Sequence, residues 1–317
     1  METSQQEITF LTRRKEIIPD SLQFRLYKIK ADNAVKLYHY KEAKNAVTTI
    51  LSEYGKYLTS KEADDYKNEL KVWLALENVS QQKVVIRKST TLKIEKDKAG
   101  PNNLKVSARG DTLNLIFDTG ANLSTTSQSI ASRLKMKIIP GDIEVNSITG
   151  KKVSAKIAVC DELTMGNIEL YHVVFLVMPD SALSFPQANY QIYGILGFPV
   201  IEALNEIQVT QDGDFIVPKE RTCFKGNSNM AMKGLTPLIY IDGEHYTFDT
   251  GVDHTMLYHK FYIENQKEID KQYQLRKIGF GGAGGKLEYE GYVINQTFQV
   301  SVKDVILKNI LFTKGKD

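Results

Sequence analysis

Cysteine is almost absent from the sequence: Cys160 and Cys223 are the only two, and neither lies in a CxxC or Cys/His cluster. This spacing disfavours a structural zinc site, which needs grouped thiolate and imidazole ligands. A disulfide between the two cysteines stays open, because the sequence does not give their separation in the fold. We therefore expect neither a metal nor another cofactor.

Long apolar runs and a strong net charge are also missing. No stretch approaches the roughly 20 apolar residues of a membrane helix, and residues 1–17 lack the apolar core of a signal peptide. A net charge of +3 is too small to build the basic face that a nucleic-acid backbone requires. We expect a soluble protein with no membrane span, no nucleic-acid partner and no recognisable targeting signal.

What the sequence does contain is ordinary globular material, with 42% hydrophobic and 25% charged residues in a chain of 317. A chain of this length holds two or three hydrophobic cores. The apolar residues from Ser21 to about Leu76 recur with helical period. Thr59-Ser60-Lys61-Glu62 fits a capping box, which predicts a helix that starts near Ser60.

We accordingly assign residues 1–82 to a small helical segment. The run from Ala34 to Ala43 resembles part of a tetratricopeptide repeat, although one copy is visible and an ordinary amphipathic helix pair explains it equally well. After about Gln82 the sequence becomes β-branched and alternating, which predicts a mostly β remainder. The stretch from about Asp212 to Asn229 is the expected linker between two related parts, residues 83–222 and 223–317.

An internal repeat carries the acidic residues of interest. Residues 110–120 read GDTLNLIFDTG, and residues 243–251 read GEHYTFDTG. Each copy is an apolar strand that ends in Phe-Asp-Thr-Gly, and each places a hydroxyl residue six positions after the Asp, Ser124 or Thr255. The sequence predicts a helix and then a glycine-containing hairpin after both copies. A lone Asp-Thr-Gly is weak evidence, but two copies in matching contexts indicate a paired function.

Residues Ile116–Ala121 and Tyr193–Gly197 resemble the signature of retropepsin-like aspartic proteases, which is a strand, Asp-Thr/Ser-Gly-Ala/Ser and a later apolar-apolar-Gly segment. The resemblance implies a mainly β fold, with bilobal acid-protease lobes of the double-psi β-barrel type preceded by the small α-helical domain. After Gly251 no second apolar-apolar-Gly segment is found, so we expect the second lobe to be incomplete at its C-terminal end.

The resemblance also assigns roles to individual residues. Asp118 and Asp249 are the expected catalytic pair, because two carboxyls that share a proton supply both the base and the acid of peptide hydrolysis. Thr119 and Thr250 are expected to bond across the lobe interface, and Ser124 and Thr255 to brace the aspartates. The remaining candidates are the glycines of the active-site loops and the tips of two flap-like hairpins: Gly120, Gly251, Ile148, Thr149, Gly150, Gly281, Gly282 and Ala283.

These expectations lead to an aspartic endopeptidase that hydrolyses an extended peptide or protein substrate with a water held between Asp118 and Asp249. Such acid chemistry favours an extracytoplasmic, periplasmic or secreted setting. One alternative is a catalytically impaired pseudo-protease or peptide-binding module, which the missing C-terminal segment favours. Another gives the main role to the helical segment, as the binding surface for a protein partner.

Overall fold

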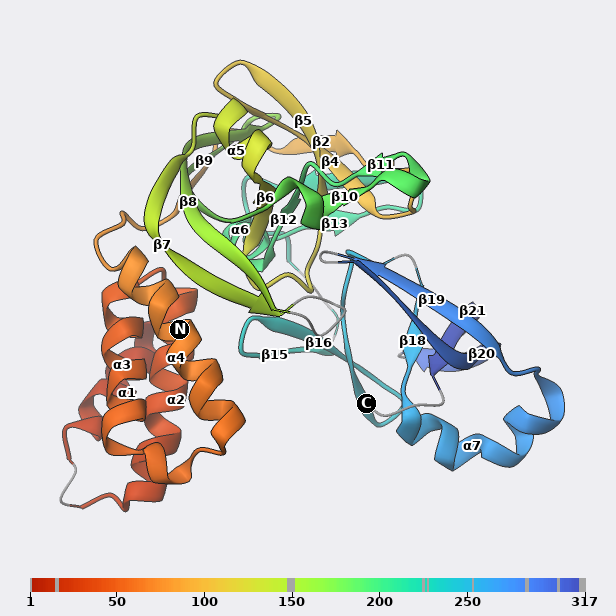
Figure 1. The fold of residues 1–317 in the computed structure, drawn as a ribbon, viewed down its shortest axis with the longest axis horizontal. Helices are drawn as coiled ribbons and strands as arrows, with labels where there is room; N and C mark the ends of the chain where they lie inside the picture. The colour runs from red at the N-terminus through yellow and green to blue at the C-terminus, as the bar shows by residue number, and fades with distance from the viewer. Residues whose placement is uncertain are drawn as a thin grey trace.

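The computed structural model describes residues 2–14, 17–146, 152–223, 226, 228–252, 254–282, 285–300 and 303–313. The N-terminal part is helical (Figure 1), with elements α1 (Glu2–Thr12), α2 (Asp20–Lys36), α3 (Tyr40–Glu53), the 3-10 helix η1 (Gly55–Tyr57) and α4 (Ser60–Leu76). The predicted capping box is confirmed: the Thr59 side chain accepts from the Glu62 N–H, and the Glu62 carboxylate accepts from the Thr59 N–H.

The rest of the described chain is mainly β, as the sequence predicts. Its first part, the first β unit, contains β1 (Lys83–Ile86), β2 (Thr90–Lys93), β3 (Glu95–Lys96), β4 (Asn102–Ala108), β5 (Asp111–Phe117), β6 (Ser124–Ser127), α5 (Gln128–Arg133), β7 (Lys137–Asn146), β8 (Lys152–Met165), β9 (Ile168–Met178), η2 (Asp180–Leu183), β10 (Ser184–Phe185), η3 (Pro186–Ala188), β11 (Tyr190–Gln191), β12 (Gly194–Leu196), α6 (Phe198–Ala203), β13 (Gln208–Val209) and β14 (Asp214–Val217).

Six of these strands close into a barrel. Along the main sheet the order is β1-β9-β6-β12-β5-β4-β8-β7, and an additional β8–β9 pairing joins the two ends of the run from β9 to β8. The short strand β12 lies inside this barrel wall, parallel to β5 on one side and antiparallel to β6 on the other. Because β5 leads into Asp118, the placement of β12 fixes the backbone that carries this carboxyl.

Strand alternation fills the barrel. In β4 and β5 every second side chain is buried, and these residues join the β8 and β9 side chains in one apolar cluster. Phe117 packs edge-on against Phe215 of β14, with ring centroids 5.0 Å apart. Such aromatic pairs add to the stability given by the burial of the rings. The packed interior of the barrel therefore fixes the position of the C-terminal end of β5.

The second β unit contains β15 (Met230–Lys233), β16 (Thr236–Ile241), β17 (Glu244–Thr247), β18 (Met256–Leu257), α7 (His259–Gln272), β19 (Arg276–Gly282), β20 (Gly285–Val300) and β21 (Lys303–Thr313). These strands form two sheets, β15-β16-β17 and β18-β21-β20-β19. A small core lies beneath the second sheet and α7, built from Leu257, Tyr262, Ile269, Tyr292, Ile294, Phe298 and Ile310.

The two β units share their connectivity. Strand β6 runs parallel to β9 in the first unit, and β18 runs parallel to β21 in the second. The hairpins that lead to the two Asp-Thr-Gly turns have the same backbone: φ is 49° and 85° at Arg109 and Gly110, and 48° and 85° at Asp242 and Gly243. Two successive left-handed residues are typical of type I′ hairpin turns, where Gly carries no steric cost.

One part of the first unit has no counterpart in the second. Among the described residues, no strand bridges β17 and β18 in the way that β12 bridges β5 and β6. Phe117 at the end of β5 is only 6% exposed, whereas Phe248 at the matching position is 40% exposed. Among the described residues, no segment of the second unit covers Phe248 as β12 and α6 help to cover Phe117 in the first.

The helical part and the first β unit share one apolar core. Buried residues of α2, α3 and α4, such as Ala34, Ile50 and Trp73, belong to the same cluster as Ile157 and Ile195 of the barrel. The Tyr38 hydroxyl also donates to the Pro199 carbonyl at 2.6 Å. The helices are therefore packed against the first β unit, and α4 lies beside β7 (Figure 1).

The boundary of the predicted linker needs correction. The predicted linker from Asp212 begins too early, because Phe215 and Val217 are fully buried and β14 pairs with β2 and β13.

Both cysteines are free thiols, Cys160 buried and Cys223 exposed, and burial raises the pKa of the Cys160 thiol to about 11. Among the helices of the described residues, none has the length and apolar content to span a bilayer.

Candidate active site

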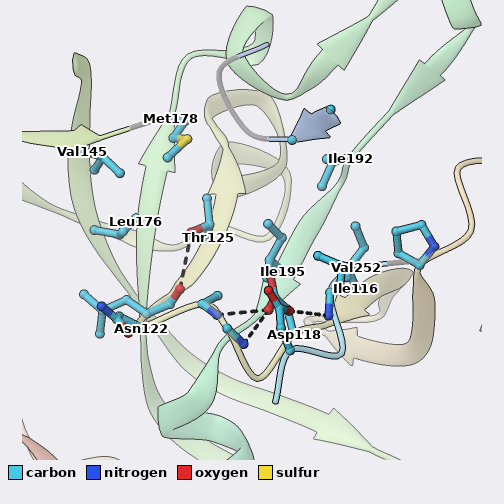
Figure 2. A pocket seen from close by; sticks show the side chains of 18 of the residues that line it. Ile116, Asp118, Asn122, Thr125, Val145, Leu176, Met178, Ile192, Ile195 and Val252 are labelled. Carbon is cyan, nitrogen blue, oxygen red and sulfur yellow. Dashed lines mark hydrogen bonds between the residues drawn. The ribbon is translucent and has the colours of Figure 1, made fainter. Parts of the chain in front are cut away.

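Each Asp-Thr-Gly segment is a tight turn that holds its own carboxylate with backbone N–H groups. Asp118 Oδ1 accepts from the N–H of Gly120 at 2.8 Å and of Ala121 at 3.0 Å (Figure 2). Asp249 Oδ1 accepts from the N–H of Gly251 at 2.9 Å. Backbone donors do not reorient as side chains do, so they fix the direction in which each carboxyl points.

The first turn is also tied to the β12–α6 segment. The Asp118 N–H donates to the Leu196 carbonyl at 3.1 Å, and the Phe198 N–H donates to the Ala121 carbonyl at 2.8 Å. Gly197 lies between these bonds, and a Cβ there would stand 2.7 Å from the carbonyl oxygen of Leu123. The glycine of the apolar-apolar-Gly segment is therefore required by the close approach of two backbones.

The two threonines join the turns to one another. The Thr119 N–H donates to Thr250 Oγ1 at 3.1 Å, and the Thr250 N–H donates to Thr119 Oγ1 at 3.0 Å. The hydroxyls donate in turn to the carbonyls of the residues just before the two aspartates: Thr119 to Phe248 O at 2.6 Å and Thr250 to Phe117 O at 2.8 Å. These four reciprocal bonds set the distance between the turns.

The glycines of the turns make room for the opposite carboxyl. A Cβ on Gly120 would stand 2.6 Å from the carboxyl carbon of Asp249, and a Cβ on Gly251 would stand 2.7 Å from Asp118 Oδ1. Real Cβ atoms essentially never approach so closely. Glycine is needed at both positions because each turn faces the aspartate of the other.

The two carboxyls form one half-buried pair. Burial, the charge of Asp249 and a hydrogen bond to the Asp249 side chain together raise the pKa of Asp118 to about 7, although the Gly120 and Ala121 N–H groups act in the opposite direction. Carboxyls this close cannot comfortably both ionise, so the pair takes up a proton that a single exposed Asp would lose. It can hold one proton and one negative charge together.

The predicted bracing residues behave differently from one another. Ser124 is buried, and its hydroxyl accepts from the Gly197 N–H at 3.0 Å, so its contact is with the β12–α6 segment and not with a carboxyl. Thr255 is exposed, and its backbone carbonyl accepts from the Leu311 N–H at 3.0 Å. Among the described residues neither side chain has a hydrogen bond to an aspartate, and the bracing of the aspartates by Ser124 and Thr255 stays a prediction.

A cleft of about 1380 Å³ opens over the pair. Asp118 lies at its base, with apolar side chains such as Ile116, Leu176 and Ile195 around it (Figure 2). Gly279, Gly281 and Gly282 of β19 line the same cleft. The other predicted hairpin residues, Ile148, Thr149, Gly150 and Ala283, lie outside the described residues.

Charge is unevenly distributed along the cleft. Its helical end carries the carboxyls of Asp32, Asp65 and Glu69, and its β19 end carries the cations of Arg276 and Lys277. Burial raises the pKa of Asp32 and of Glu69, and Glu69 also accepts from the Trp73 indole N–H at 2.8 Å. In the described part of the chain no three His, Cys, Asp or Glu side chains are grouped to hold a metal ion.

The helical wall of the cleft was missed by sequence reasoning. Residues of α2 and α4, including Asp32, Val35, Asn68 and Trp73, line the cleft together with both aspartates. In the sequence these positions belong to ordinary amphipathic helices, and nothing in their spacing distinguishes a residue that lines a cleft from one that contacts solvent. Only the packing of α4 beside β7 reveals them.

Residues 104–200 match a family model described as aspartyl protease. The match covers the barrel from β4 into α6 and includes the first Asp-Thr-Gly segment and Gly194–Gly197, whereas Asp249 lies outside it. Among solved structures, a retropepsin-like aspartic protease from Rickettsia conorii is similar, with 14% identity over 43% of this chain and 92% of that chain and a TM-score of 0.28. No curated protein matches.

Proposed function

We propose that this chain is an aspartic endopeptidase that hydrolyses peptide bonds with a water activated between Asp118 and Asp249. The observation that carries the proposal is the half-buried carboxyl pair, in which the two side chains share a hydrogen bond and the pKa of Asp118 is raised to about 7. The family match to residues 104–200 supports a protease-type function.

The chemistry follows from one shared proton. The ionised carboxyl of the pair takes a proton from water as the water attacks the peptide carbonyl, and the protonated carboxyl donates toward the carbonyl oxygen. A carboxyl then delivers a proton to the departing amine. The N–H groups of Gly120 and Ala121 hold Asp118, and the bonds between Thr119 and Thr250 keep the two turns in place.

Within this proposal the two β units, residues 83–222 and 223–317, are the lobes of a bilobal acid protease, and residues 1–82 form a helical domain attached to the first lobe. The shared connectivity of the units and their matching hairpin turns support it. The substrate is an extended peptide or unfolded protein segment, because the cleft of about 1380 Å³ is lined by both apolar and polar groups.

Cleavage of an unfolded protein tests the proposal, measured at acidic and neutral pH with and without a transition-state peptide inhibitor. Asp118→Asn and Asp249→Asn should each lower the rate roughly a thousandfold or more, because the members of a catalytic pair act as a unit. Asp212→Asn, which changes an exposed turn carboxyl of the first unit, is the matched control and should retain the rate. Equal cleavage by all four proteins would exclude the mechanism.

A peptide-binding module without hydrolysis is the second candidate. The exposure of Phe248 and Val252, at 40% and 46%, favours it, because Asp249 then lies on a less completely packed unit than Asp118. The same experiment separates the two functions. Tight binding of the peptide inhibitor by a protein that cleaves nothing identifies the binding module.

A further inference from the structure

Strand β7 is an edge strand, and one of its backbone positions is occupied by a helix side chain. In the described sheet β7 pairs with β8 alone, so its other side presents unpaired N–H and C=O groups. At Glu144 both groups are bonded to Asn68 of α4. The Asn68 Nδ2 donates to the Glu144 carbonyl at 2.5 Å, and the Glu144 N–H donates to Asn68 Oδ1 at 3.0 Å.

An asparagine amide carries a donor and an acceptor side by side, as the backbone of a neighbouring strand does. Asn68 therefore takes the place of a strand at this one position and attaches β7 to α4. The Glu144 side chain is not involved, since its carboxylate pairs with Lys152 across the hairpin at 2.6 Å. The contact depends on the backbone of β7 and the side chain of Asn68.

The attachment lies on the wall of the cleft that contains the two aspartates. Asn68, Val72 and Trp73 line this cleft from α4, and Ile143, Glu144 and Val145 line it from β7. Figure 2 shows Val145 on the same side of the pocket as Leu176 and Met178, above Asp118. Movement of β7 relative to α4 would therefore change the shape of the cleft without touching either carboxyl.

The helix itself is well fixed. Val72, Trp73 and Leu76 of α4 are buried in the core that the helices share with the barrel, which includes Ile143 of β7. The Trp73 ring stacks on Tyr40 of α3 with ring centroids 6.2 Å apart. Asn68 thus connects β7 to an element whose own position is set by packing, which is what the support of a binding site requires.

We propose that Asn68 is a positioning residue of the peptide cleft: it holds the edge strand β7 against α4, so that the helical domain forms one wall of the substrate-binding site. This inference rests on the proposed peptidase function, because it assigns the cleft to substrate. It makes the helical domain a part of the binding site and gives Asn68 an effect on substrate affinity with no part in the chemical step.

The test compares Asn68→Ala with wild type and with Asn45→Ala, a matched control on the exposed face of α3. With a peptide substrate, Asn68→Ala should raise KM roughly five- to tenfold, the loss expected for hydrogen bonds of this kind, with kcat within about twofold of wild type. Asn45→Ala should change neither constant. A kcat loss at constant KM, or no change at all, overturns the inference.

Amide hydrogen exchange at Glu144 tests the bonds between Asn68 and the β7 backbone directly and does not depend on catalysis. In wild type the Glu144 N–H should exchange slowly, and in Asn68→Ala it should exchange at least several-fold faster while the amides of β9 keep their protection. If the alanine variant does not fold, the wild-type protein alone still tests the inference. A Glu144 amide that exchanges in wild type as fast as in an unfolded chain would show that Asn68 does not hold β7. A wild-type protein that cleaves no peptide overturns the proposed function, and the exchange result then stands alone.

Discussion

At the scale of single residues, the site depends on two glycines as much as on two aspartates. Gly120 lies against the carboxyl of Asp249, and Gly251 lies against the carboxyl of Asp118. Any side chain at either position has to displace the opposite carboxyl. The requirement is chemical as well as steric, since the displaced group is one half of the proposed catalytic pair.

Gly120→Ala is therefore expected to damage catalysis more than folding. The new methyl group would push the Asp249 carboxyl away, and overpacking of this kind costs about 1–3 kcal/mol of folding free energy. Cleavage should fall at least roughly a hundredfold, because small misplacements of reacting groups have effects of that size. Gly55→Ala is the control, since a Cβ at Gly55 meets nothing within 4 Å. Full activity in Gly120→Ala would refute the close approach.

The raised pKa of Asp118 predicts a pH-dependent stability. The folded protein binds this proton more tightly than the unfolded chain, so the contribution of Asp118 is present below about pH 4 and is lost as the pH rises through about 7. Asp118→Asn removes the repulsion between two ionised carboxyls. Its melting temperature relative to wild type should be higher at pH 8 than at pH 5, by roughly 2 °C or more. Calorimetry that finds the same difference at both pH values would contradict the paired titration.

At the scale of elements, the two Asp-Thr-Gly strands are built alike but covered differently. Phe117 at the end of β5 is buried against Phe215, while Phe248 after β17 is exposed. The difference follows from β12 and α6, which complete the first unit and have no counterpart among the described residues of the second. Equivalent residues of an internal repeat therefore contribute unequally to stability.

A pair of alanine substitutions measures that inequality. Phe117→Ala should cost about 3–5 kcal/mol of unfolding free energy, the usual range for a buried phenylalanine. Phe248→Ala should cost about 1 kcal/mol or less, because 40% of this residue is already in contact with water. Urea denaturation of both variants checks the prediction. Equal losses would contradict the unequal burial of the two phenylalanines.

The sequence predicted those elements whose positions are set by neighbouring residues. The capping box at Thr59 predicted the start of α4, and the repeated Phe-Asp-Thr-Gly predicted the positions of both turns. Contacts between distant segments were not accessible. The bond from Gly197 to Ser124 spans 73 residues, and the bonds between Asn68 and Glu144 span 76. Neither contact can be predicted from the spacing of the residues near it in the sequence.

The predicted linker illustrates the same limit. Asp212 to Asn229 contains Pro218, Gly226 and several basic residues, a composition typical of a connection between units. Four residues within it, Asp214–Val217, nevertheless form β14 and contribute two fully buried side chains to the barrel core. Composition described the segment as a whole, whereas the pairing of β14 with β2 depends on a partner more than a hundred residues away.

At the scale of the whole molecule, the helical domain and the barrel cannot be treated as separate modules. They share a core, and both line the cleft over the carboxyl pair. A protein partner at the helical domain, its tetratricopeptide character and an extracytoplasmic location stay predictions.

The central claim is that Asp118 and Asp249 act as one pair with one shared proton, and the pH profile of kcat/KM tests it most directly. Wild type should be active at acidic pH and lose activity as the pH rises through about 7, where the pair gives up its proton. Asp118→Asn and Asp249→Asn should show no profile above background. Wild-type activity that persists undiminished well above pH 7, or a normal profile in either variant, would contradict the account.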